Sequence, residues 1–379
     1  MPWCRLVAST ATTIRTDDAV PIRHVAVEAF LVPTDAHESD GTFEWDATTL
    51  VLVTLAAGGV QALGYTYADR SSATLIAETL APLVRGRNAF DAVAIRDDLV
   101  RAVRNLGSRG IAATAISAID NALWDLRAKL LGVSLLDLIG AARDCVAVYG
   151  SGGFTSYDDA RLAHQLSGWA GAGIARVKMK VGREPWRDPA RVAAARSAIG
   201  SSCALFVDAN GAYSRKQALA LADGFADYGV TWFEEPVSSD DLEGLHLLRE
   251  RAPSGMDISA GEYGYDGFYF RRMLEALAVD VLQADATRCL GISGFLQAAA
   301  LCAAHATPLS AHCAPALHAH VGCACGNVRH IEWFHDHARI ERMLFDGAPQ
   351  PRDGCLVPDR SRPGLGLEFK RADAARYAT

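Results

Sequence analysis

The chain has 379 residues, half of them hydrophobic, and carries a formal net charge of −7. A chain of this length can bury a large core and is expected to form roughly two domains. The negative charge and the lack of a basic tract in the sequence exclude nucleic acid and an anionic membrane surface as partners. An anionic substrate would therefore need positive charge supplied locally.

The start of the sequence contains no apolar stretch long enough for a secretion signal, and no later segment reaches membrane-spanning length. We therefore expect a cytoplasmic protein, with no membrane partner, and we expect it to be a homo-oligomer. The nine cysteines are an odd number spread through the chain. They predict reduced thiols rather than a disulfide framework.

Three segments near the N-terminus predict antiparallel strands. Residues 22–32 and 49–57 are rich in β-branched and apolar side chains with partial alternation. Gly58 and Gly59 then predict a hairpin turn that leads into a strand over residues 60–67. The polar, turn-rich segment 33–43 predicts a loop, of a length that is often functional.

From residue 73 to about residue 139, apolar residues recur at intervals of three and four, which predicts a bundle of helices. Gly132 is a plausible helix C-terminus. Strands followed by helices indicate an α+β domain, and we place it at residues 1–142.

The next region alternates short apolar runs with Ala-rich amphipathic segments, which is typical of a parallel sheet covered by helices. Eight such units over residues 143–354 predict a closed (β/α)8 barrel. The Pro-rich tail, residues 355–379, is expected to pack on the first domain. The eight predicted strands are residues 146–149, 176–180, 205–207, 232–233, 257–260, 281–283, 309–311 and 330–331.

Polar residues stand at the ends of these strands, where a barrel of this kind has its active site. Asp208, Glu234 and Glu262 follow three consecutive strands. Each acid by itself would more often be a helix cap or a surface charge. Three hard carboxylates converging on one point predict a Mg²⁺ site that keeps positions open for substrate oxygens.

Lys178 and Lys180 are two residues apart on one predicted strand, so both side chains face the barrel interior. Two solvated surface lysines would be the ordinary interpretation of this spacing. Beside the three acids, we instead expect mutual repulsion to lower the pKa of one lysine toward the range of a general base.

His312 ends another strand, and Asp285 ends the strand before it, so the carboxylate can orient the imidazole and raise its basicity. A zinc site near His312 is the competing interpretation. Its possible ligands match no common zinc spacing. They are Cys313, His318, His320, Cys323 and Cys325.

The ordered set K-x-K, D-x-N, E-E-P, G-E, D, H and E from Lys178 to Glu332 resembles the mandelate racemase subgroup of the enolase superfamily, the mandelate racemase and muconate lactonizing enzyme family. The resemblance extends through residues 118–125 into the N-terminal strands. It implies a modified (β/α)8 TIM barrel with an α+β N-terminal capping domain completed by the C-terminal tail. One departure is Cys289-Leu290-Gly291, where relatives often have two glycines.

The resemblance also implies roles for the residues. Asp208, Glu234 and Glu262 would bind Mg²⁺, Lys180 and the His312–Asp285 pair would be the two acid/base groups, and Asn210 would lie close to the substrate. Lys178 and a protonated Glu332 would bind the substrate carboxylate and stabilise the enediolate formed when the adjacent proton is removed. The segment 33–43, with His37, and the following hairpin, with Tyr65 and Tyr67, are expected to contact the rest of the substrate.

Two reactions share this intermediate. Loss of a β-hydroxyl would dehydrate a sugar acid to a 2-keto-3-deoxy acid, and reprotonation on the other face would make the protein a racemase or epimerase of a 2-hydroxy acid. We favour dehydration because it is the commoner activity among relatives with this residue set, and because the polar segment around His37 suits a polyhydroxylated substrate. A non-catalytic carboxylate-binding protein is a third alternative, which the unbroken residue set disfavours.

Overall fold

The computed structural model describes residues 19–379. Cys4 and most of the segment on which the secretion prediction rests lie outside the described residues. Within residues 19–379, no helix is both long and apolar enough to cross a membrane. The cysteines of this range are all free thiols, as the sequence predicts.

The N-terminal sheet contains three antiparallel strands in the order β1 (His24–Ser39), β2 (Glu44–Ala57) and β3 (Val60–Tyr67). Gly58 and Gly59 form the expected turn between β2 and β3, and both have positive φ angles, 57° and 78°, which glycine adopts without strain. The three-strand prediction is confirmed.

The prediction of a loop over residues 33–43 holds for residues 40–43 and is wrong for residues 33–39. β1 continues to Ser39, β2 begins at Glu44, and the pairing register shifts between Pro33 and Glu38. This bulge accommodates a proline in the ladder. The extension is also held from outside, because the Thr155 backbone N–H donates to the Ser39 carbonyl at 2.8 Å. Residues 38 and 39 still pair with β2, so the polar composition hid an ordinary strand that begins again after the register shift.

The helices of the first domain follow the sheet. The longest, α4, lies against the sheet where Gly64 has no side chain, since a Cβ at Gly64 would lie 2.2 Å from the Ala122 nitrogen. Gly132 ends α4 in the left-handed conformation, as expected. These elements are α1 (Ser71–Leu75), the π-helix η1 (Ile76–Leu80), α2 (Ala81–Val84), α3 (Ala92–Ala102), α4 (Ile111–Leu131) and α5 (Leu135–Ile139).

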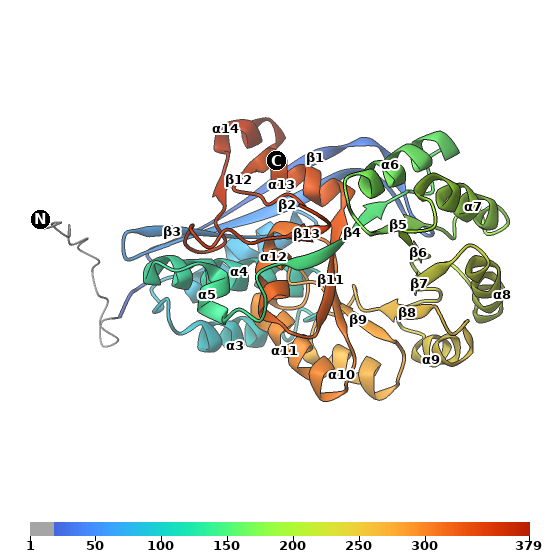
Figure 1. The fold of residues 1–379 in the computed structure, drawn as a ribbon. Helices are drawn as coiled ribbons and strands as arrows, with labels where there is room; N and C mark the ends of the chain where they lie inside the picture. The colour runs from blue at the N-terminus through green and yellow to red at the C-terminus, as the bar shows by residue number, and fades with distance from the viewer. Residues whose placement is uncertain (1–18) are drawn as a thin grey trace, which may run out of the picture.

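Eight parallel strands form the second sheet, which closes because β11 pairs with β4. The closed barrel confirms the fold predicted from the sequence (Figure 1). The strands are β4 (Val146–Gly152), β5 (Arg176–Lys180), β6 (Ala204–Asp208), β7 (Val230–Glu234), β8 (Asp257–Ala260), β9 (Val281–Ala284), β10 (Leu309–Ala311) and β11 (Val328–Phe334).

Helices alternate with these strands along the chain and surround the sheet in Figure 1. They are α6 (Asp159–Gly171), α7 (Asp188–Ile199), α8 (Arg215–Ala226), α9 (Leu242–Arg251), α10 (Gly267–Glu275), α11 (Gly291–Ala304) and α12 (Pro315–Ala324). Leu290 precedes α11 with a φ angle of +68°, which costs a non-glycine residue roughly 1–2 kcal/mol. Leu290 packs against the core of the first domain, which helps to hold this conformation.

The strand register brings the polar series together. Lys180 is the pairing partner of Asp208, and Asp208 is the pairing partner of Glu234 on the next strand. Below these residues, Tyr149, Phe206 and Trp232 fill the barrel interior as a buried cluster. The carboxyl ends of adjacent parallel strands therefore meet above a packed core.

The C-terminal segment, red in Figure 1, returns to the first domain. The Thr379 backbone N–H donates to the Ala29 carbonyl at 3.1 Å, and Leu135 donates to the Gly364 carbonyl at 2.7 Å. Because β13 also pairs with barrel strand β4, the boundaries at residues 142 and 354 stay a prediction. The elements are α13 (His335–Leu344), β12 (Phe345–Asp346), β13 (Cys355–Leu356), β14 (Glu368–Phe369), α14 (Arg371–Ala374) and the 3₁₀ helix η2 (Ala375–Tyr377).

Candidate active site

Eight of the predicted residues meet at the carboxyl ends of the barrel strands, and we call them the strand-end cluster. All are buried. The members are Lys178, Lys180, Asp208, Glu234, Glu262, Asp285, His312 and Glu332.

The three expected metal ligands lie together in this cluster. One oxygen from each of Asp208, Glu234 and Glu262 lies within 4.8 Å of the others. Glu262 Oε2 is buried and accepts no hydrogen bond, and burial and the charge of Asp208 raise the pKa of Glu234. Crowded carboxylates with an unsatisfied oxygen fit a hard divalent cation such as Mg²⁺.

Both lysines of the cluster face carboxylates. Lys180 Nζ lies 2.6 Å from Asp208 Oδ2, and Lys178 Nζ lies 2.9 Å from Glu332 Oε1 and also contacts Glu234. Burial disfavours the charge on each lysine, but the facing carboxylates outweigh burial and raise both pKa values. The predicted fall in one lysine pKa is therefore wrong for this arrangement. The reason is that acids from other strands outweigh the repulsion between the two lysines.

The expected histidine–aspartate pair is present. His312 Nδ1 lies 2.8 Å from Asp285 Oδ2, which leaves Nε2 directed toward Glu262 Oε2 at 3.4 Å. Burial would raise the pKa of Asp285, but the hydrogen bond and charge of His312 hold that pKa below its ordinary value. An ionised Asp285 fixes the orientation of the imidazole ring.

Glu332 is surrounded by groups that favour its ionised form. Burial disfavours its charge, but Lys178 and His312 hold its pKa well below the ordinary value. Glu332 Oε2 also accepts a hydrogen bond from the Cys313 backbone N–H at 2.8 Å. Without substrate, three positive or N–H groups surround this carboxylate and favour its ionised form. The protonated Glu332 expected beside the enediolate stays a prediction.

A cavity of about 490 Å³ lies between the strand-end cluster and the first domain. From the cluster, Lys180, Glu262, His312 and Glu332 line it. Its opposite side, which we call the cap wall, comes from the turn after β1, from β2, and from the end of β3. The cap wall consists of Asp40, Phe43, Trp45, Thr48, Thr49, Tyr67 and Asp69.

The structure places Asn210 and Tyr67 at this cavity, as expected. Asn210 Oδ1 accepts a hydrogen bond from Lys180 Nζ at 3.1 Å. His37 does not line the cavity. Its side chain is half exposed and bonds Asp46 at 2.9 Å, because alternation along β1 directs it away from the barrel. Tyr65 is fully buried and donates to Glu341 instead.

The possible zinc ligands do not form one group. His318 Nε2 accepts from the Ala286 backbone N–H, and His320 Nε2 bonds the Leu365 carbonyl. Of the five residues considered from sequence, only Cys313 belongs to a group of three potential ligands within 4.8 Å of one another in the described part of the chain, and its partners are His312 and Glu332. This arrangement disfavours a structural zinc site.

Three lining residues were not singled out from the sequence. Arg288 Nη1 lies 3.4 Å from Glu262 Oε1, His337 stacks on Tyr67 with ring centroids 3.5 Å apart, and Asp40 belongs to the cap wall. Arg288 could have been identified from the sequence as a lining residue, because it follows Asp285 by three positions. Asp40 lies in the segment 33–43 that was expected to contact the substrate, whereas no sequence pattern indicated His337.

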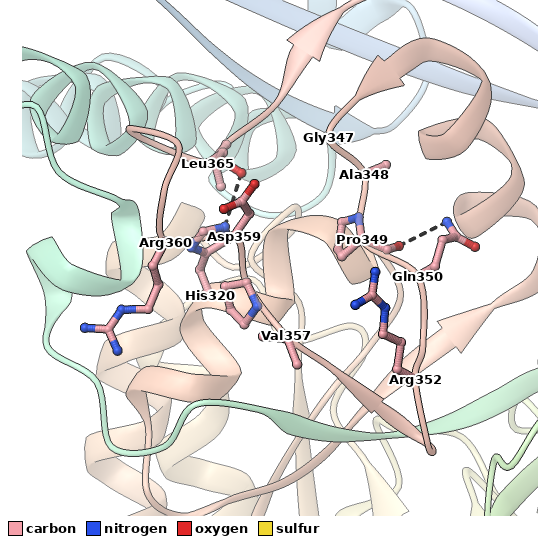
Figure 2. A pocket seen from close by; sticks show the side chains of 11 residues that line it. His320, Gly347, Ala348, Pro349, Gln350, Arg352, Val357, Asp359, Arg360 and Leu365 are labelled. Atoms are coloured by element: carbon pink, nitrogen blue, oxygen red, sulfur yellow. Dashed lines mark hydrogen bonds between the residues drawn. The ribbon is translucent and has the colours of Figure 1, made fainter.

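A second pocket, of about 480 Å³, lies between α12 and the C-terminal segment. Figure 2 shows His320, Arg352, Asp359 and Arg360 on its sides. Burial lowers the pKa of His320 to about 4, so this ring is neutral near pH 7. None of the strand-end cluster lines this pocket, which separates it from the predicted chemistry.

Comparisons with known families agree with the geometry. Residues 160–374 match the model described as enolase C-terminal domain-like. Residues 27–140 match the N-terminal domain of mandelate racemase and muconate lactonizing enzyme. The chain belongs to the enolase superfamily, in its mandelate racemase and muconate lactonizing enzyme group.

Among superfamily members, L-talarate/galactarate dehydratase of Salmonella typhimurium is 32% identical over 330 residues, covering 85% of this chain and 80% of that one. A mandelate racemase/muconate lactonizing enzyme-like protein from Rubrobacter xylanophilus is 53% identical, with a TM-score of 0.93 over 95% of this chain and 100% of that one. A racemase from Streptomyces coelicolor with bound magnesium is 27% identical, with a TM-score of 0.89 over 94% of this chain and 100% of that one.

Proposed function

We propose that this enolase-superfamily protein is a Mg²⁺-dependent enzyme that dehydrates a sugar acid to a 2-keto-3-deoxy acid. The observation that carries the proposal is that the two acid/base groups lie beside different members of the carboxylate triad. This triad consists of Asp208, Glu234 and Glu262. Lys180 Nζ lies 2.6 Å from Asp208, and His312 Nε2 lies 3.4 Å from Glu262. A substrate bound at the triad would therefore have a proton acceptor from each of two separate strands.

The proposed roles follow from the contacts. Asp208, Glu234 and Glu262 would hold Mg²⁺, which when bound supplies positive charge beside the substrate carboxylate. That charge would also offset the carboxylates that raise the lysine pKa values, and so lower the pKa of Lys180.

Lys180 Nζ would remove the proton next to the carboxylate, and His312 Nε2 would donate a proton to the departing hydroxyl. Asp285 would orient the imidazole ring of His312 for that transfer. Lys178 would bind the substrate carboxylate, and the added negative charge would raise the pKa of Glu332 toward protonation. Glu332 could then donate a hydrogen bond to the developing enediolate.

Similarity to a sugar-acid dehydratase supports elimination as the outcome. Racemisation or epimerisation of a 2-hydroxy acid is the alternative, and the presence of two acid/base groups favours it, because a proton must leave one face and return to the other. The unbroken cluster argues against a non-catalytic carboxylate-binding protein.

A screen of sugar acids with the Mg²⁺-loaded protein tests the proposal. Keto-acid formation detected with semicarbazide, and lost in Lys180→Ala, is the expected result. Exchange of the α-proton with D₂O, accompanied by the epimer and by no keto acid, would instead establish the racemase alternative.

A further inference from the structure

The cap wall carries negative charge at the cavity. Asp40 and Asp69 are its two ionisable acids, and the other lining residues of the wall are neutral. Asp40 is only 9% exposed and lines the cavity. Asp69 lies at the rim, where the Ser71 backbone N–H donates to its Oδ1 at 2.8 Å.

The two oxygens of Asp40 have different surroundings. Oδ1 accepts hydrogen bonds from the backbone N–H groups of Thr42 and Phe43, each at 2.7 Å, and so fixes the turn between β1 and β2. Oδ2 accepts no hydrogen bond from any residue in the range 19–379. One oxygen therefore holds the turn, and the other is left as an acceptor at the cavity.

The positive charge that lines the cavity comes from the barrel and not from the cap wall. Among the described residues, the lysines and arginines lining the cavity are Lys180 and Arg288. Lys180 is paired with Asp208, and Arg288 Nη1 lies 3.4 Å from Glu262 Oε1. His337 adds no charge near pH 7, because burial lowers its pKa to about 3.

We propose that the cap wall is a subsite for the neutral hydroxyl end of a monocarboxylic sugar acid, with Asp40 Oδ2 accepting a hydrogen bond from a terminal hydroxyl. This inference rests on the proposed function, which places the reacting carboxylate at the strand-end cluster. A second carboxylate at the far end would meet Asp40 and Asp69 without a cation to pair with. Selection against such a ligand by like charge is a common source of specificity.

The inference separates this chain from the Salmonella relative, whose name specifies talarate and galactarate, which carry a carboxylate at each end. An aldonic acid of the same stereochemistry has a CH₂OH group in place of the second carboxylate. The hydroxyl is a donor that Asp40 can bind, whereas the carboxylate offers only acceptors at neutral pH.

Matched pairs of acids test the inference with the full-length, Mg²⁺-loaded protein. Galactonate is compared with galactarate, and gluconate with glucarate, because the members of each pair differ only at the terminal carbon. Both kcat/KM for keto-acid formation and Kd by calorimetry are measured. For the best-accepted monocarboxylate, we expect kcat/KM to be at least about tenfold higher than for its dicarboxylate partner, and Kd to be lower by a similar factor. One unfavourable charge contact gives an effect of this size.

The variant Asp40→Asn tests whether the charge of Asp40 causes the preference for monocarboxylates. Asn keeps an oxygen for the Thr42 and Phe43 N–H groups but removes the charge. The ratio of kcat/KM for the monocarboxylate to that for the dicarboxylate should therefore fall by about tenfold. Asp46→Asn is the matched control, since the Asp46 side chain is 79% exposed and bonds His37 outside the cavity. The control should leave the preference unchanged.

The outcomes distinguish the inference from the proposed function. Equal or better use of a dicarboxylate overturns the inference and leaves dehydration intact. An unchanged preference in Asp40→Asn also overturns it. Tighter binding of monocarboxylates without any keto acid supports the subsite and contradicts dehydration.

Discussion

The strand-end cluster and the cap wall face the same cavity but are built differently. The cluster comes from strands of a closed sheet whose register fixes each side chain relative to its neighbour, as in the pairing of Lys180 with Asp208. The cap wall comes from the hairpins of the N-terminal sheet, β1 to β3. These hairpins are anchored to the rest of the chain at a few points, including the hydrogen bond from Thr155 to Ser39 and the hydrogen bond from Tyr65 to Glu341. Chemistry that needs precise positioning lies on the closed sheet, and contacts that can vary lie on the hairpin.

The loss of metal should have the largest effect, because it removes charge from the whole cluster. EDTA should abolish activity and Mg²⁺ should restore it. Glu234→Ala should also abolish activity and should remove the rise in Tm that Mg²⁺ gives by binding the folded state. Full activity in metal-free Glu234→Ala would contradict the metal assignment.

Substitution of either acid/base group should have the next largest effect. We expect it to lower the rate by about 10²- to 10⁴-fold. In D₂O, Lys180→Ala should abolish exchange of the α-proton in one configuration. His312→Asn should abolish it in the other configuration and leave the first measurable. Lys216→Ala, at an exposed position, is the control. Wild-type exchange and turnover in both variants would remove these residues from the mechanism.

A change in the cap wall should alter selectivity more than stability. Tyr67→Phe removes a hydroxyl that lies 3.5 Å from the His337 carbonyl and keeps the ring that stacks on His337. We expect relative kcat/KM values between sugar acids to shift by about 3- to 10-fold. His37→Ala, outside the cavity, should leave them unchanged. A uniform fall with all substrates would indicate a structural role for Tyr67.

The smallest effect concerns how the hairpin responds to pH. Burial raises the pKa of Glu38 to about 8, while Trp45 donates to its Oε2 at 2.9 Å. A carboxyl with a raised folded-state pKa binds more protons in the folded state than in the unfolded state. Its contribution to stability is complete below about pH 4.5 and is lost as the pH rises toward 8.

Glu38→Gln should therefore show a smaller fall in Tm between pH 5 and pH 8 than the wild type. Glu28→Gln, on the same strand, is a matched control that should keep the wild-type slope. Equal slopes in all three proteins would show that Glu38 does not titrate in this range.

The sequence by itself determined the barrel and the strand-end cluster. Apolar runs alternating with amphipathic segments predict parallel strands, and the carboxyl ends of such strands meet at one edge. Asp208, Glu234 and Glu262 could therefore be grouped from their positions in the chain alone. The spacing of Lys178 and Lys180 likewise placed both on one face, because alternation along a strand is a local property.

Only the tertiary structure decided the ionisation of the cluster and the composition of the cap wall. The lysine pKa values rise, and that of Glu332 falls, because of partners from distant parts of the chain. Asp40 and His337 enter the cavity from opposite ends of the sequence. Periodicity reports the direction of a side chain from its own backbone, whereas electrostatics and cavity lining depend on distances between segments that no local pattern encodes.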